Sequence, residues 1–384
     1  MKNSCTDLLM NKTTPHSIFC FLVLLVAVQT DAFGQLKNDN QPTDDRVHSV
    51  AALDVDSKTK EPAHITKKER SENKTDKKKP VVVKADLLLY GAGDNVDTIG
   101  VWETERPEDS LIFVSAKENQ TVEVWKFPFK NNEQKPMKRT EWKDGSVNGI
   151  WIDQEKDLLY VTVGKEPSSA FVYSLPKLEL KMQFVNKSRD LFTEPNITLL
   201  KRPAKRDLAY VTSDQQTSIH ETDTGKQLEL FDSPTDVETI YGDEFYQCVY
   251  VPDENDRSGV NVYTPELKPF NKNGKNHFGS GVFDSDAEGV WVYYSSGHGK
   301  PDDGRGYIVV SDQIDGLTEF EFFDRQTWEH LGTLNIEGVG NTDGICSSQR
   351  PLPGYPLGFF AAIHDDQALA IVKWETVLKA LGLQ

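Results

Sequence analysis

One sequence pattern recurs along the chain after Pro80 and constrains the fold more than any other feature. A short apolar strand is followed by a polar turn and a second short strand, and six copies occur in the 384-residue sequence. The copies begin at residues 111, 158, 208, 248, 306 and 358. They are spaced roughly 40 to 60 residues apart, the period of a propeller blade rather than of a helical solenoid. The chain is therefore predicted to be all-β, a six-bladed β-propeller. Helical periodicity is nearly absent, and its best candidate is residues 374–381.

The acidic charge of the chain argues against a nucleic-acid partner. The formal net charge is -17 and the isoelectric point is near 5.0, whereas nucleic-acid binding needs a basic face that releases counterions from phosphates. An excess of carboxylates serves solubility, or it collects divalent cations through oxygen ligands. Because a ring of blades brings loops from distant segments to one mouth, isolated carboxylates in loops are site candidates.

The N-terminal residues are predicted to serve export rather than folding. Lys2 and Lys12 precede an apolar run at 18–28, and residues 32–34 have the small-x-small pattern of a cleavage site. The run is about half of the roughly 20 residues needed to cross a bilayer. Residues 1–34 are therefore expected to be a signal peptide of a secreted protein without a stable membrane span, and an uncleaved anchor is the alternative. Residues 35–80 lack apolar periodicity and are predicted to be a disordered charged linker before a propeller domain at 81–384.

Two further features fit the secretory pathway. Cys248 and Cys346 remain after the predicted signal peptide, and the sequence leaves open whether they form a disulfide. Glycosylation sequons, which predict a glycoprotein, occur at Asn73, Asn119, Asn186 and Asn196.

Three acidic clusters are expected at blade loops, at residues 253–254, 284–288 and 341–344. In the second cluster Asp286 and Glu288 alternate before an apolar strand, so both side chains point to one side and could bind one cation. A solvated strand start is the alternative for that cluster, and an ordinary turn is the alternative for residues 341–344. The sequence contains no GxSxG elbow, Walker loop or HExxH motif.

The C-terminal part of the chain resembles the β-propeller phytases. The resemblance rests on sequence motifs at residues 286–294, 306–313, 341–345, 355–362 and 372–375. Their order, spacing and residue types follow the family, and a thinner likeness extends over residues 85–381. The resemblance implies six blades, in agreement with the copies counted above. It also implies Ca²⁺ ions at one mouth of the propeller, where they bridge carboxylates and substrate phosphates.

The resemblance also implies roles for particular residues. Asp97, Asp343 and Glu238 fall on positions expected to be catalytic, and Lys117 and Lys165 are the nearest matches to a substrate-binding basic clamp. The positions of family metal ligands are occupied by Asp97, Glu238, Asp253, Glu254, Asp286, Glu288 and Asp343. Thr98 stands where the family has a second, adjacent carboxylate.

Two functions follow from this resemblance. The first is a monomeric, secreted, calcium-dependent phosphomonoesterase of the 3-phytase type that hydrolyses inositol hexakisphosphate. Inositol hexakisphosphate carries many negative charges. A propeller mouth lined by carboxylates could bind it only through cations that lie between the carboxylates and the phosphates. The second, suggested by Thr98, is a secreted propeller that binds calcium and a ligand or protein without turnover.

Overall fold

The computed structural model describes residues 77–383, apart from gaps at 92–94, 130–135, 142–144, 165–168, 187–193, 215, 234–236 and 255–258. The chain divides into two units, Met1–Ala63 and His64–Gln384, and every described residue belongs to the second. The predicted signal peptide and most of the predicted linker therefore lie outside the described residues.

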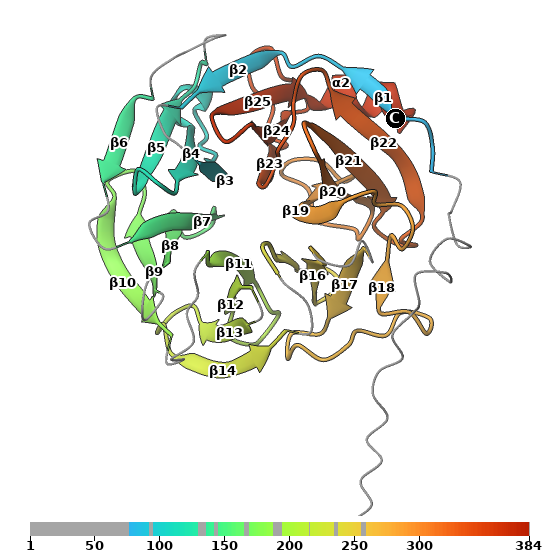
Figure 1. Ribbon diagram of the computed structural model, residues 1–384. Helices are drawn as coiled ribbons and strands as arrows, with labels where there is room; N and C mark the ends of the chain where they lie inside the picture. Colours follow the sequence, from blue (N-terminus) through green and yellow to red (C-terminus); the bar gives the residue numbers. More distant parts are fainter. Residues whose placement is uncertain are drawn as a thin grey trace, which may run out of the picture. The chain divides into compact units, whose positions relative to one another are not determined.

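The second unit is a ring of six β-sheets, as Figure 1 shows. The innermost strands of the sheets are β3, β7, β11, β15, β19 and β23, and each contacts the innermost strands of the two neighbouring sheets. From its innermost strand each sheet runs outward through antiparallel neighbours, and only the added strand β1 of blade 5 is parallel to its partner. The predicted six-bladed propeller is confirmed.

Blades 1 to 3 each consist of four consecutive strands. Blade 1 contains β3 (Val96–Trp102), β4 (Leu111–Ala116), β5 (Thr121–Lys126) and β6 (Lys138–Glu141), with the short 3-10 helix η1 (Pro107–Asp109) between β3 and β4. Blade 2 contains β7 (Ser146–Asp153), β8 (Leu158–Gly164), β9 (Ser169–Ser174) and β10 (Glu179–Val185). Blade 3 contains β11 (Asn196–Leu200), β12 (Leu208–Ser213), β13 (Gln216–Glu221) and β14 (Gln227–Asp232).

Blade 4 likewise consists of four consecutive strands, β15 (Tyr241–Asp243), β16 (Cys248–Pro252), β17 (Val260–Tyr263) and β18 (His277–Phe278).

Blades 5 and 6 each receive a strand from the beginning of the domain. Blade 5 contains β19 (Asp286–Tyr294), β20 (Gly306–Ile314), β21 (Leu317–Asp324) and β22 (His330–Ile336), and β1 (Val81–Val83) pairs in parallel with β22. Blade 6 contains β23 (Ile345–Ser348), β24 (Phe359–His364) and β25 (Ala368–Lys373), and its outermost strand is β2 (Leu87–Tyr90). The helix α2 (Trp374–Leu381) follows β25, where the sequence predicted it.

The ring is closed by the pairing of β2 with β25, visible in Figure 1. This antiparallel pairing joins residues near the start of the domain to residues near its end, and it covers an edge strand of blade 6.

The core lies between neighbouring blades. Phe113 of blade 1 packs in one apolar cluster with Val161 of blade 2, and Val172 of blade 2 packs in another with Val211 of blade 3. The six predicted copies fall on the second and third strands of the blades, whose faces both pack against neighbouring sheets. These strands are therefore apolar on both faces, which made them visible in the sequence.

Candidate metal site

Five of the predicted metal ligands meet where the innermost strands begin, a place that we call the funnel mouth. Asp97, Glu238 and Asp343 form one group, and Glu238, Glu254 and Glu288 form a second. Within each group, one oxygen of every carboxylate lies within 4.8 Å of the others. Glu238 belongs to both groups, so the two are contiguous. A set made only of carboxylate oxygens has the hard-donor chemistry that Ca²⁺ prefers.

β-Bulges position two of these carboxylates. The register of β3 against β4 shifts between Val96 and Ile99, and that of β19 against β20 shifts between Ala287 and Val290. Asp97 and Glu288 lie inside these shifts. In both bulges a serine hydroxyl of the partner strand accepts a backbone N–H, Thr98 to Ser115 at 2.9 Å and Gly289 to Ser311 at 2.7 Å. A bulge re-aims the side chains that it carries, and here each one carries a carboxylate of the site.

Two glycines allow neighbouring blades to approach closely at the funnel mouth. A Cβ atom on Gly344 would lie 2.1 Å from the carbonyl oxygen of Asp97, and one on Gly289 would lie 2.5 Å from the carbonyl oxygen of Asp343. Both distances are too short for any side chain. The carboxylates of blades 1, 5 and 6 can therefore gather only because these two positions lack a side chain.

Raised pKa values are found for four of the carboxylates at the funnel mouth, Asp97, Glu238, Glu288 and Asp343. Burial is the main cause, and repulsion between neighbouring carboxylates adds to it. The pKa of Asp343 rises to about 7, with Asp97 as the main repelling charge. Burial and repulsion raise the pKa values of Glu238 and Glu288 well above their ordinary value. Without a cation these groups therefore hold protons more readily than free carboxylates do, and a bound cation would displace those protons and stabilise the ionised forms.

Lys117 lies among the carboxylates of the first group. Its Nζ atom is 2.9 Å from Asp97 Oδ1, 2.8 Å from Glu194 Oε2 and 3.7 Å from Glu238 Oε1. Burial opposes the ammonium charge, but Asp97 and Glu238 outweigh that cost and raise the pKa of Lys117. Lys117, which was predicted to bind substrate, thus provides a covalently attached positive charge inside the first acidic group. Glu194 was not predicted, because it follows a segment without any recognisable motif.

Gln313, at the end of β20, links the two groups. Its Nε2 donates to Glu288 Oε2 at 3.0 Å and to Asp343 Oδ1 at 2.6 Å. The sequence analysis gave Gln313 no role, although it ends one of the motifs on which the resemblance rests. An amide in this position fixes the orientation of both carboxylates.

Two further predicted metal ligands, Asp253 and Asp286, belong to neither group. Asp253 is buried at the exit of β16, and its backbone N–H donates to Gly259 at 2.9 Å. Asp286 begins β19 and pairs in register with Gln313. Lys165 lies outside the described residues.

Thr98 makes a structural contact between blades. It is buried, and its hydroxyl donates to the backbone carbonyl of Asn148 in blade 2 and lies 2.9 Å from Ser115 Oγ. The hydroxyl is therefore bonded to protein groups where the family has a second carboxylate.

A third acidic group, formed by Asp284, Asp312 and Glu319, surrounds Lys77. The Lys77 ammonium lies 2.6 Å from Glu319, 3.0 Å from Asp284 and 3.3 Å from Asp312. Glu321, 2.9 Å from the same ammonium, acts with Glu319 and Asp284 to outweigh the burial that disfavours the charge, so the pKa of Lys77 is raised. This group therefore already pairs with a cation of the chain.

The structure also bears on the residues linked to secretion. Cys248 and Cys346 are buried and free, so they do not form a disulfide with each other. The side chains of Asn186 and Asn196 are buried, and their oxygens accept hydrogen bonds from Ser218 Oγ at 2.6 Å and from the Ile197 N–H at 2.7 Å. Such burial leaves no room for a glycan at these two predicted sequons. Asn119 is exposed, and Asn73 lies outside the described residues.

A sequence model of the Phytase family matches residues 217–384. The resemblance to the β-propeller phytases is confirmed. The phytase match runs from β13 to the end of the given sequence, and it includes four of the five grouped carboxylates of the funnel mouth, Glu238, Glu254, Glu288 and Asp343. It supports a phosphatase-type hydrolase. No curated protein matches the chain. In the part of the chain that the structure describes, no helix is both long and apolar enough to span a membrane.

Proposed function

We propose that the protein is a secreted, calcium-dependent phosphomonoesterase that releases phosphate from inositol hexakisphosphate. The supporting observation is the pair of carboxylate groups that share Glu238 at one mouth of a propeller whose C-terminal blades match the phytase family. The proposed catalytic residues are Asp97, Glu238 and Asp343.

The residues at the funnel mouth fit Ca²⁺. Their donors are carboxylate oxygens without histidine or cysteine, and their raised pKa values indicate that they lack full compensation. The first group would hold one ion and the second group another. When bound, calcium would supply the positive charge that holds substrate phosphates and stabilises the charge that develops on them.

The protein's own groups would prepare this site. Gln313 holds the carboxylates of Glu288 and Asp343 in fixed orientations. Lys117 places a permanent positive charge beside Asp97, where a phosphate oxygen could also bind it. A lysine ammonium is a point charge, so it would attract a phosphate without selecting one orientation. We propose Lys165 as a second lysine for the substrate.

One observation favours a second function, a propeller that binds calcium and a ligand without turnover. Thr98 bonds to Asn148 and adds no carboxylate to the site. The first group consequently holds one carboxylate fewer than the resemblance leads us to expect.

Phosphate release from inositol hexakisphosphate, measured with calcium and with EDTA, tests the proposal. We expect release that depends on calcium and falls more than a hundredfold in Asp343→Asn, equivalent to about 3 kcal/mol of transition-state stabilisation. The control is Asp223→Asn, which removes an exposed carboxylate paired with Lys156. If the wild-type protein binds calcium but releases no phosphate at any calcium concentration, the binding propeller is correct.

A further inference from the structure

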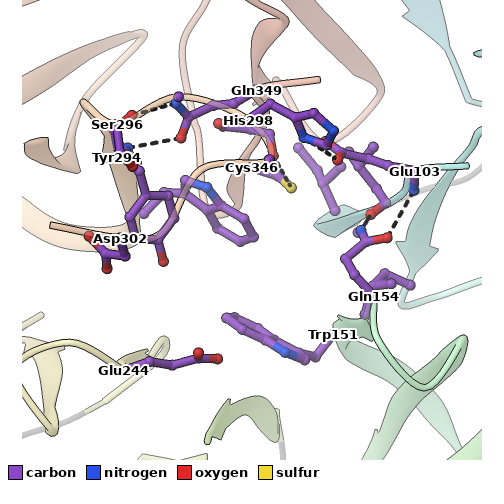
Figure 2. Close-up of a pocket in the computed structure, with 18 of the residues that line it drawn as sticks. Glu103, Trp151, Gln154, Glu244, Tyr294, Ser296, His298, Asp302, Cys346 and Gln349 are labelled. Carbon is purple, nitrogen blue, oxygen red and sulfur yellow. Dashed lines mark hydrogen bonds and ion pairs between the residues drawn. The ribbon is translucent and has the colours of Figure 1, made fainter. Parts of the chain in front are cut away.

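The opposite mouth of the propeller, where the innermost strands end, contains a cavity of about 370 Å³. Figure 2 shows this cavity. Five of the six blades contribute to its wall, with Glu103 from blade 1, Gln154 from blade 2, Glu244 from blade 4, Tyr294 from blade 5 and Gln349 from blade 6. Its volume lies within the range of roughly 300 to 1,000 Å³ that is usual for small-molecule sites.

A layer of aromatic rings lies between this cavity and the funnel mouth. Trp151, Tyr241 and Trp291 pack against one another with ring centroids 5.3 to 5.6 Å apart. Trp291 lies three residues after Glu288 and three before Tyr294, and Tyr241 lies midway between Glu238 and Glu244 in the same way. None of the grouped carboxylates lines the cavity. The cavity is therefore lined by other residues than those of the proposed calcium site.

The polar side chains of one wall are held in place by hydrogen bonds. Glu103 accepts from Ser348 Oγ at 2.6 Å, and its other oxygen lies 3.5 Å from His298 Nδ1. Gln154 accepts the N–H of Glu103 at 3.0 Å, and Gln349 bridges to the backbone of Tyr294. Such side chains offer fixed donors and acceptors to a ligand at little further entropic cost.

Other groups at the cavity remain available to a ligand. Among the described residues, neither the Glu244 carboxylate nor the Lys300 ammonium has an ion-pair partner within 4.0 Å. Figure 2 shows Glu244 pointing into the open centre of the cavity, toward the ring of Trp151. The indole of Trp291 also faces the cavity. The lining thus combines two aromatic faces with carboxylate, amide, imidazole and ammonium groups.

We propose that this cavity binds a neutral saccharide, in the size range of a monosaccharide or disaccharide. The apolar C–H face of a sugar ring packs on an indole, while its hydroxyls both donate and accept hydrogen bonds, as this lining requires. A phosphorylated ligand would face the carboxylates of Glu103, Glu244 and Asp302, and an ammonium ligand, although these groups attract it, would also face Lys300. A ligand without net charge avoids both repulsions.

The test uses the full-length protein and a panel of neutral sugars: glucose, galactose, mannose, N-acetylglucosamine, maltose and cellobiose. Binding is measured by saturation-transfer NMR and by tryptophan fluorescence. We expect saturable binding of at least one sugar with a change in fluorescence. Glu244→Gln, which replaces the carboxyl group that faces the open centre of the cavity, should weaken that binding about tenfold. Its matched control is Glu229→Gln on the exposed face of β14.

Several outcomes decide the proposal. His298→Ala provides a second test of the wall if Glu244→Gln does not fold. Absence of saturable binding for every sugar, or binding that both cavity variants leave unchanged, overturns the site. Saturable binding of choline without any sugar overturns the ligand class. Asp343→Asn, at the funnel mouth, should leave sugar binding intact, so this proposal and the proposed phosphatase can fail independently.

Discussion

The Lys117 ammonium lies 2.9 Å from the Asp97 carboxylate, inside a group of acids that could hold a divalent cation. A tethered positive charge in that position competes with a metal ion. It also neutralises part of the carboxylate charge while the ion is absent.

Replacement of Lys117 by methionine tests this competition. We expect Lys117→Met to bind calcium about tenfold more tightly, because one repelling charge is removed. Its calcium-free form should be less stable than the wild type, because Asp97 and Glu194 lose their partner. Titration calorimetry and thermal unfolding measure the two effects, and Lys84→Met, at an exposed ion pair with Glu337, is the control. Weaker calcium binding in Lys117→Met would show that the lysine supports the metal site.

Gln313 is predicted to raise the calcium affinity of the metal site without contacting the ion. Gln313→Leu keeps the approximate size of the side chain but removes the hydrogen bonds to Glu288 and Asp343. Loss of such an orienting partner should lower calcium affinity by about tenfold or more. Calcium titration measures this effect, with Gln183→Leu on the outer strand β10 as the control. Equal affinities in the two variants would refute the orienting role.

The calcium-free protein should lose stability as the pH rises. Asp343 has a folded-state pKa of about 7, and those of Glu238 and Glu288 are raised well above their usual value. The folded state therefore retains protons that the unfolded chain releases. The free energy of unfolding is therefore greatest below the pKa values that these groups have in the unfolded chain. It declines as the pH rises through the pKa values that they have in the folded protein.

Thermal unfolding in EDTA from about pH 5 to pH 8 checks this sign. We expect the melting temperature to fall across the series in EDTA and to change less with saturating calcium, which binds the ionised carboxylates. A melting temperature that rises with pH in EDTA would contradict the raised pKa values.

Close approach of blades 6 and 1 should make Gly344 intolerant of substitution. The Cβ atom of Gly344→Ala would meet the Asp97 carbonyl at 2.1 Å, and the backbone must move to relieve this clash. We expect a loss of about 2 kcal/mol or more in the free energy of unfolding. Chemical denaturation measures it, and Gly332→Ala is the control because the new Cβ would meet only the end of the Leu381 side chain, at 3.1 Å. Equal losses in both variants would refute the constraint.

The blade repeat could be predicted from sequence because the middle strands of most blades are apolar on both faces. The third copy showed only one such strand, β12. Its partner β13 is also buried, but it carries polar residues, among them Ser218 and His220, which bond to Asn186. A strand that buries a hydrogen-bonded network has no apolar pattern for the sequence to reveal.

The candidate site was only partly predictable. Asp253 and Glu254 are adjacent in sequence and were expected to act as a pair, but only Glu254 joins a carboxylate group. Neighbours in a regular extended chain point to opposite sides, so two adjacent carboxylates reach one ion only where a β-bulge re-aims them. Lys117 could be singled out by its resemblance to a basic clamp. Its contacts with Asp97 and Glu194 depend on how the blades are placed around the ring, which no local pattern encodes.

Ring closure by β2 and β25 has a consequence for how the protein is made. Blade 6 lacks its outermost strand until residues 87–90 meet residues 368–371, which are synthesised much later. Asp97 and Asp343 are likewise separated by most of the domain, yet they share one carboxylate group. A chain still being translated therefore possesses neither a closed ring nor the first carboxylate group until these later residues have been made, and calcium can assist folding through that group only after Asp343 has been synthesised.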